Sequence, residues 1–390
     1  MTSLVNRILY RVSLSLITAA AVTTAAAQQS EIGTTTDAQA QTQNKTKIAL
    51  IVSPKGSVLS EAAAPIQQGI LAASREATAS GACELIQYEL SSPQDAGAVL
   101  KKAADDGAVL AIGPVSRDAV QTISEMPYLP LPVVAINRPS GETAPELFLS
   151  IDISAESEVD QLAKIAVENT AQKTDLAANN FVILTTQDPY DERLARAMEA
   201  ALIKAGAGAE RRHISSDQIA YLRQEMRGKA FRGVFFAMNA QNASLLRPYL
   251  PPELPVFGTS YTNPMHQKDS MLAKTQANDL NGMITLEIPA EENASTLVAQ
   301  YKGDRENLSP EDLQMFSVGV DAWQLGTKWI DWARRIEVPN GLTGRLSFDK
   351  DNGSKVKREL LKTVVSPNKT GKTSEEDLVQ FTESAEEAGL

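Results

Sequence analysis

Side chains that often carry out chemistry are present in this chain, but not at the spacings that catalysis requires. No serine stands in a Gly-x-Ser-x-Gly turn, no histidine pair forms His-Glu-x-x-His, and no Ser-x-x-Lys lies beside a supporting motif. Neighbouring carboxylates occur at Asp105–Asp106 and Glu375–Glu376. These pairs fall at a helix end and in an acidic tail, where carboxylates are usually solvated. The sequence therefore predicts no catalytic residues and no enzyme.

Metal and phosphate sites are not indicated either. His213 and His266 are the two histidines, and neither lies in a cluster of ligand-type residues, so we predict no transition-metal site and no cofactor. The segment SPNKTGKT, residues 366–373, has Ser366 where a phosphate-binding loop begins with glycine, and acidic residues follow it. The single Cys83 cannot form an internal disulfide, and we expect it to be buried.

Charge and the first residues indicate where the protein acts. The formal net charge is −11 and the basic residues form no stripe, so nucleic acid is not an expected partner. Arg7 and Arg11 precede an apolar run from Val12 to Val22, and three alanines end at Ala27. This layout is typical of a cleaved secretory signal over residues 1–27, with an uncleaved anchor helix as the alternative. We therefore expect a periplasmic protein.

Two segments without periodicity flank the body of the chain. Residues 28–46 are rich in Gln, Thr and Ala, which predicts a flexible linker. Residues 365–390 carry six acids and two lysines, which predicts a disordered acidic tail. Between them lie roughly 320 residues, more than one ordinary hydrophobic core accommodates and enough for two lobes.

Short apolar segments alternate with helical patterns along this body. Ten segments predict strands: 47–52, 84–90, 108–114, 132–137, 147–152, 181–186, 210–215, 233–238, 254–259 and 283–288. Regular alternation of strands and helices is typical of parallel sheets covered by helices on both faces. The fold class is therefore α/β.

The order of the segments resembles that of the type I periplasmic binding proteins. Residues 47–73 resemble the first strand and helix of that superfamily, and residues 147–166 resemble its first crossover between lobes. Residues 182–206 are similar to the opening unit of the second lobe, and GLTGRLSFDKDNG, residues 341–353, to the last crossover strand. The resemblance implies a two-lobed fold in which three crossovers join the lobes.

Lobe boundaries follow from this resemblance. We expect lobe 1 to contain residues 47–150 and 286–339, and lobe 2 to contain residues 151–285 and 340–364. The glycines of residues 341–353 are explained by tight turns and close strand approach rather than by a phosphate.

One branch of the superfamily matches better than the amino-acid transporters. LPVFGTSYTNP (254–264), DLNGMITLEIP (279–289) and MFSVGVDAWQL (315–325), followed by residues 341–349, resemble the C-terminal domain of LppC-type penicillin-binding-protein activators. The resemblance implies a non-catalytic protein that binds and stimulates a bifunctional peptidoglycan synthase. The helical-repeat domain and the lipidated cysteine of that family have no counterpart here, so outer-membrane association is not implied.

A two-lobed fold also implies a cleft that takes a small ligand. By resemblance, six residues are candidates to line it: Val115, Ser116, Asn137, Arg138, Tyr190 and Asn239. Each could equally cap a helix or satisfy a local polar group. The transport branch places an acid for the ligand's ammonium in the region of residues 239–242, where this chain has none, and an unpaired buried ammonium is costly.

Three hypotheses about function stand. The first is a regulator of cell-wall synthesis. The second is a substrate-binding protein of an ABC importer for a small amino-acid-like or anionic ligand, which ligand-dependent closure of the lobes would identify. The third, an exported enzyme, lacks a nucleophile and base pair in the sequence.

Overall fold

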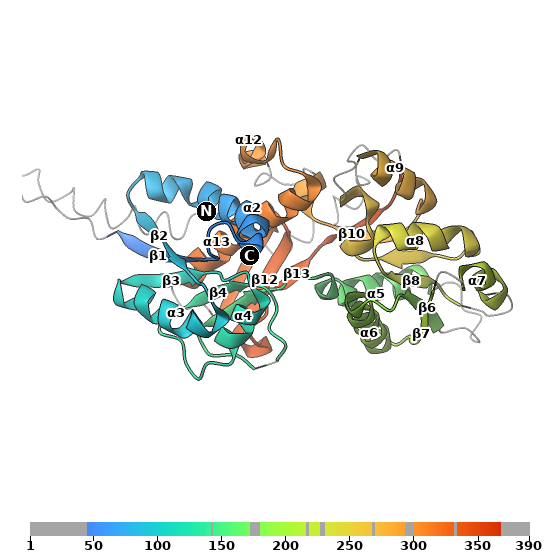
Figure 1. Cartoon of the computed structure of the whole chain (residues 1–390), viewed down its shortest axis with the longest axis horizontal. Helices are drawn as coiled ribbons and strands as arrows, with labels where there is room; N and C mark the ends of the chain where they lie inside the picture. Colours follow the sequence, from blue (N-terminus) through green and yellow to red (C-terminus); the bar gives the residue numbers. More distant parts are fainter. Residues whose placement is uncertain are drawn as a thin grey trace, which may run out of the picture.

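The computed structural model describes residues 45–141, 143–171, 180–215, 218–226, 231–266, 270–292, 299–330 and 334–367. The predicted signal peptide, residues 28–44 of the predicted linker and residues 368–390 of the predicted tail lie outside these ranges. Figure 1 shows two lobes side by side along the long axis of the molecule, connected by strands. Among the described residues, no helix has the length and apolar character needed to cross a membrane.

Lobe 1 is built on a parallel sheet of five strands. In spatial order these are β2 (Cys83–Glu89), β1 (Thr46–Val52), β3 (Ala108–Ile112), β4 (Val133–Ile136) and β5 (Phe148–Ile151). Strands β4 and β5 are buried along their whole length, as expected when helices cover both faces of a parallel sheet. One face packs on α2 (Val58–Ala79) and α13 (Pro310–Trp329), and the other on α3 (Ala96–Asp105) and α4 (Arg117–Ser124).

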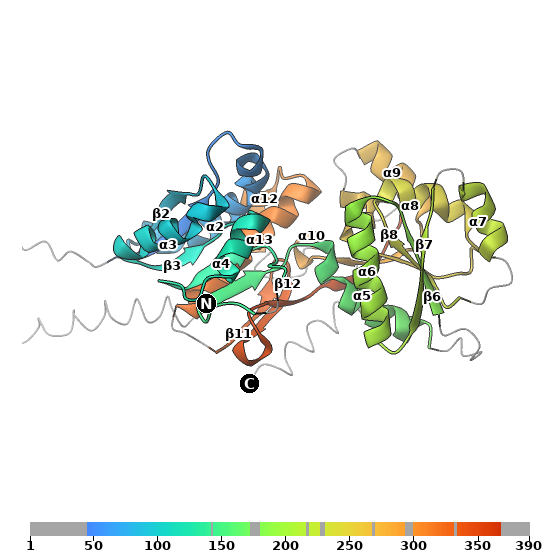
Figure 2. The same cartoon turned by 60° about the horizontal axis from the view of Figure 1, so that its bottom comes forward.

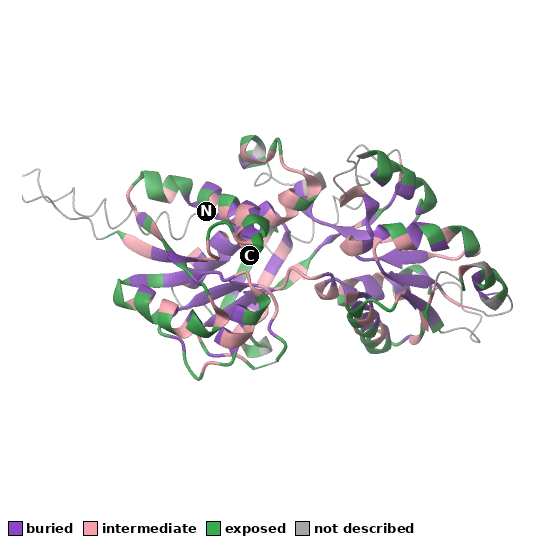
Figure 3. Ribbon diagram, viewed as in Figure 1, coloured by how far each residue is buried: buried purple, intermediate pink, exposed green. Residues whose placement is uncertain are grey.

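Lobe 2 has a sheet of six strands. Their order is β14 (Leu361–Val364), β10 (Ile284–Glu287), β9 (Val256–Gly258), β8 (Val234–Ala237), β6 (Asn180–Thr185) and β7 (Gly208–His213), and β14 alone is antiparallel to its neighbour. One face packs on α5 (Val159–Asn169) and α6 (Pro189–Lys204). The opposite face packs on α7 (Ile219–Met226), α8 (Ala240–Leu246) and α9 (Ser270–Asp279) (Figure 2). Burial concentrates on the strands at the centre of each lobe (Figure 3).

Three segments pass between the two sheets. The first runs from β5 to α5, and the second runs from β10 through α10 (Pro289–Glu292) and α12 (Lys302–Arg305) to α13. The third runs from the hairpin of β11 (Arg335–Gly341) and β12 (Gly344–Asp349), through β13 (Lys357–Glu359), to β14. The predicted fold class, with two α/β lobes and three crossovers, is confirmed.

The last crossover differs in one respect from the expectation. Residues 340–364 were expected in lobe 2, but β12 pairs with β11 and places Leu346 and Phe348 in the apolar cluster of lobe 1. Only β14 joins the second sheet. The hairpin stays on lobe 1 because its alternate apolar residues face α13 and β4. The exact lobe boundaries stay a prediction.

Glycines allow two close approaches that hold this arrangement. A Cβ on Gly319 of α13 would lie 2.0 Å from the carbonyl oxygen of Ile66 on α2, and a Cβ on Gly69 would lie 2.0 Å from that of Phe316. The two helices therefore touch backbone to backbone. In the hairpin, Gly344 has φ +130 and its Cβ position is 2.2 Å from the Glu359 oxygen, which is the close strand approach that the sequence predicted.

Candidate functional site

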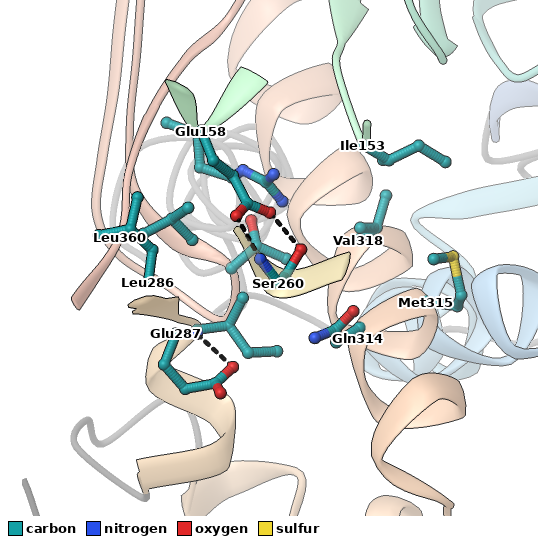
Figure 4. A pocket seen from close by; sticks show the side chains of 12 residues that line it. Ile153, Glu158, Ser260, Leu286, Glu287, Gln314, Met315, Val318 and Leu360 are labelled. Atoms are coloured by element: carbon teal, nitrogen blue, oxygen red, sulfur yellow. Dashed lines mark hydrogen bonds between the residues drawn. The ribbon is translucent and has the colours of Figure 1, made fainter. Parts of the chain in front are cut away.

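A small pocket lies where all three crossovers meet (Figure 4). Its lining comes from both lobes: Ile153, Glu158, Ser260, Leu286, Glu287, Ile288, Gln314, Met315, Val318, Thr343, Arg358 and Leu360. The free volume is about 30 Å³. A water molecule requires roughly 10–15 Å³ by this kind of measure, whereas ligand pockets usually have about 300–1,000 Å³. The pocket has room for one or two waters.

Glu158 joins the first crossover to lobe 2. It precedes α5 and is buried, and its carboxylate accepts hydrogen bonds from the backbone N–H of Ser260, at 2.8 Å, and from the Ser260 hydroxyl. Burial raises the pKa of Glu158, while the Ser260 hydrogen bonds and the charge of Arg358 oppose that rise. The side chain is therefore held in place by Ser260, which follows β9.

His266 connects lobe 2 to α13. Gln314 Nε2 lies 3.0 Å from His266 Nδ1, and His266 Nε2 lies 2.9 Å from Glu287 Oε2. Asn263 Nδ2 donates to the same glutamate oxygen at 3.0 Å. His266 thus bridges the end of β10 and the start of α13, on opposite sides of the second crossover.

Asp321 on α13 holds the turn of the β11–β12 hairpin. Its carboxylate accepts from the backbone N–H groups of Leu342, at 2.9 Å, and Thr343, at 2.8 Å, and from the Thr343 hydroxyl at 2.6 Å. Burial raises the pKa of Asp321 to about 6, although these three donors favour the charged form. The third crossover is thereby tied to the helix that ends the second.

This arrangement positions the crossovers and offers little to a reacting molecule. Glu158 and Glu287 both face the pocket, but each already accepts hydrogen bonds from protein donors. Within the described ranges, no three His, Cys, Asp or Glu side chains are grouped so that they could hold a metal ion. The pocket is best understood as a hydrogen-bonded hinge.

The predicted lobe 1 residues lie together at the ends of the strands, where they have local roles. Ser116 caps α4, with its Oγ 3.4 Å from the N–H of Ala119. Asn137 donates to the Val115 carbonyl at 3.0 Å and accepts from the N–H of Arg138 at 2.8 Å. Val115 also borders a cavity of about 10 Å³ between β1, β3 and β4, which fits at most one water.

The predicted lobe 2 residues are also engaged in local contacts. Tyr190 packs edge-on against Tyr261, with ring centroids 4.8 Å apart, and Arg193 lies 5.0 Å above its ring. Burial raises the pKa of Tyr190. Asn239 caps α8 by accepting from the N–H of Asn242 at 2.9 Å. Among the cavities lined by described residues, the one that contains Val115 and the one that contains Arg138 include neither Tyr190 nor Asn239. Their role as ligand contacts stays a prediction.

The buried polar residues of the hinge were not predicted from the sequence. Asp321 gave the clearest signal, because it is a lone carboxylate within the apolar helical stretch MFSVGVDAWQL. The sequence contains no such signal for Glu158, His266 and Glu287, because their hydrogen-bond partners are distant in sequence.

Comparison with known proteins gives the same architecture. No family model and no curated protein match the sequence. Among solved structures, a branched-chain amino acid ABC transporter protein from Chromobacterium violaceum has a TM-score of 0.66 at 23% identity, covering 82% of this chain and 100% of that one. The chain has the fold of type I periplasmic binding proteins.

The LpoA C-domain from Haemophilus influenzae, a regulator of PBP1A, shares this fold. Its TM-score is 0.63 at 17% identity, over 84% of this chain and 98% of that domain. Full-length LpoA from the same organism has a TM-score of 0.65 at 16% identity, and the match spans 58% of its length. Because these identities are below 25%, the likeness concerns the fold, and function must be argued from the site.

Proposed function

We propose that the chain is a non-catalytic exported protein that binds and stimulates a bifunctional peptidoglycan synthase. The observation that carries the proposal is the hinge. The pocket at the hinge has about 30 Å³ free, and Glu158, His266 and Glu287 in and beside it are bonded to protein partners. A binding protein that closes on a solute needs an accessible cleft with unsatisfied polar groups, and here the predicted contacts Ser116 and Asn239 cap helices.

The resemblance to activator proteins and the fold shared with the LpoA C-domain support this choice over an enzyme. In this function the two lobes provide an extended surface for a protein partner. The hinge hydrogen bonds keep the lobes at a defined angle, so that the surface is preorganised for binding.

Reconstitution with a synthase tests the proposal. The full mature chain is added to a purified bifunctional peptidoglycan synthase from the same organism, and glycan polymerisation and cross-linking of a lipid-linked precursor are followed. We expect a saturable rise in rate and direct binding. A leucine-binding protein of the same fold is the control and should have no effect. Absence of both binding and stimulation would refute the proposal.

A substrate-binding protein of an ABC importer is the second candidate, and one observation favours it. Asp191, at the start of α6 beside Tyr190, is buried, and its Oδ1 accepts no hydrogen bond within distance in the described part of the chain, although Tyr261 lies beside the carboxyl and opposes the rise in its pKa that burial causes. Thr186 donates to the other oxygen at 2.5 Å. This carboxylate is a possible partner for a ligand ammonium, which residues 239–242 do not provide.

A thermal-shift screen distinguishes the two candidates. An amino acid at 100 times its dissociation constant stabilises its binding protein by about 2.7 kcal/mol. A clear shift that disappears in Asp191→Asn, with no effect on the synthase, would establish the importer function instead.

A further inference from the structure

A long groove borders the hinge on the side of α5 and α6, and the functions above leave it unassigned. Its volume is about 810 Å³, within the size range of ligand sites. One wall is the first half of α5 and the second half of α6, and the other is residues 355–359 with Arg138 and Asp152. We call it the crossover groove. Because the helices belong to lobe 2 and Arg138 and Asp152 follow strands of lobe 1, an occupant of the groove touches both lobes.

The lining of the groove combines apolar side chains with an excess of basic ones. Val159, Ala201 and Val356, from three different segments, line it and are buried. Six basic residues also line it, against four acidic ones: Arg138, Lys164, Lys204, Lys355, Lys357 and Arg358. This local excess contrasts with the net charge of −11 for the whole chain. The matching occupant therefore carries both apolar side chains and negative charge.

Helix α6 gives the groove its width and further apolar contacts. Ala197 and Ala200 line the groove, and their small side chains leave space beside the helix. Ile203 lies three residues after Ala200, so the two share a face of the helix, and Ile203 is 62% exposed. The exposed Lys204 follows directly. This wall suits an occupant with side chains as large as Leu or Phe, such as an amphipathic helix in a groove.

The end of the sequence has the matching chemistry. Residues 374–390, which we call the acidic segment, contain six acids and no basic residue, and they lie outside the described ranges. Free in solution, so acidic a segment is expected to be disordered, and such segments can fold on binding. Apolar residues recur in it at spacings of three and four, which predicts one apolar face of a bound helix: Leu378, Phe381, Ala385 and Ala388.

The place where the described chain stops brings this segment within reach of the groove. Lys362 of β14 donates to Asn169 Oδ1 at 3.3 Å, so the chain passes the last residue of α5 shortly before it stops at Pro367. The groove lies along the other end of α5, and a helix of 11 residues spans about 16 Å. The seven residues from Pro367 to Ser374 extend up to about 23–25 Å. The tether is therefore long enough.

We infer that the acidic segment, residues 374–390, docks in the crossover groove of its own chain. Its apolar face packs on the alanines of α6, and its carboxylates lie against the lysines of both walls. A short flexible tether gives an effective concentration of about 1 mM, so weak contacts are sufficient and the segment outcompetes a dilute external peptide. Since both lobes line the groove, docking ties them together beside the hinge. The inference does not depend on the proposed function.

A fluorophore on the acidic segment of the full mature chain tests the inference. Gln380 lies off the predicted apolar face, so Gln380→Cys takes a maleimide dye without a change of charge. Cys83 is buried and stays unlabelled, and wild-type protein is the blank. At low salt we expect the anisotropy of the dye to lie well above its value in the urea-unfolded chain, and to fall as salt is added.

Charge variants locate the docking site. Lys164→Glu/Lys357→Glu should remove at least half of this excess anisotropy, and Glu386→Lys/Glu387→Lys added to it should restore the loss. Lys55→Glu/Lys274→Glu is the matched control, with the same charge change at exposed sites outside the groove, and should leave the anisotropy unchanged. Thermal melts check that the variants fold. Equal losses in the two double variants would overturn the inference, because only net charge would then matter.

An uncharged pair of variants tests the apolar face. Phe381→Ser should also remove at least half of the excess anisotropy, whereas Val379→Ser, on the opposite face of the predicted helix, should have no effect. Two results would contradict the inference outright. Excess anisotropy that disappears on dilution of the protein would mean docking on a second copy, and no excess at low salt would mean no docking. No synthase is present, so these outcomes are independent of the proposed function.

Discussion

Asp321 allows a quantitative test of how the hinge is built. The carboxyl is fully buried on α13, and burial raises its pKa from the ordinary 3.8 to about 6, against the effect of the hydrogen bonds from Leu342 and Thr343. Because the pKa is higher in the folded state, folded protein binds this proton more tightly than unfolded chain. The contribution of Asp321 to stability is therefore greatest below pH 4 and is lost as the pH rises through about 6.

The size of the effect follows from the pKa difference. A change of one pKa unit corresponds to 1.36 kcal/mol, so a difference of about two units corresponds to about 3 kcal/mol. Asp321→Asn is neutral at every pH and lacks this contribution. At pH 4 the unfolded chain is already partly ionised, so the stability of the wild type minus that of Asp321→Asn should fall by about 2 kcal/mol between pH 4 and pH 7.

Urea denaturation followed by tryptophan fluorescence measures this difference, since Trp323 and Trp329 are buried near the hairpin. Both proteins are unfolded at pH 4, 5, 6 and 7, and equal m-values establish that the same surface is exposed. Asp279→Asn, on the exposed side of α9, controls for the loss of one charge. A difference that stays constant or increases with pH would refute the reasoning, because it would mean that the three donors outweigh burial.

Three further changes test the packing. Gly319→Ala places a Cβ 2.0 Å from the Ile66 carbonyl and should destabilise by about 1–3 kcal/mol or more, whereas Gly303→Ala, with no atom within 4 Å, should be nearly neutral in a thermal melt. Ser309→Ala removes the cap of α13 and should cost about 1 kcal/mol in urea denaturation, and an unchanged midpoint would contradict that role. Burial raises the pKa of Cys83 to about 11. A thiol reagent at pH 8 should therefore react slowly with this cysteine until urea unfolds the chain. Rapid reaction of the folded protein would contradict the burial of Cys83.

The local pattern of apolar residues was sufficient to predict the strands of the two large sheets. Each of the ten predicted strands corresponds to one of β1–β10, because runs such as KIALIV and VFFA are too short and too β-branched or aromatic to prefer a helix. The glycines around 341–344 were also assigned correctly to close backbone approach. The packing of β12 was not, because a strand with alternating apolar residues does not specify which lobe it covers.

The candidate site could be predicted only in part. Ser116 and Asn239 follow apolar strands and precede helices, so the sequence indicated that each could be a cap, and the structure gives each that role. The partners of His266 could not be found in this way. Glu287 lies 21 residues away and Gln314 lies 48 residues away, on two different elements.

The sequence by itself determined the strand and helix order, the acidic net charge and the absence of recognisable catalytic motifs. These properties depend on residue type and on the spacing of residues that lie a few positions apart in the chain. Only the tertiary structure decided which polar side chains meet at the hinge. Glu158 and Ser260 are 102 residues apart in the chain, and they form their hydrogen bond only when the crossovers bring the two lobes together. The same packing buries Glu158 and thereby raises its pKa.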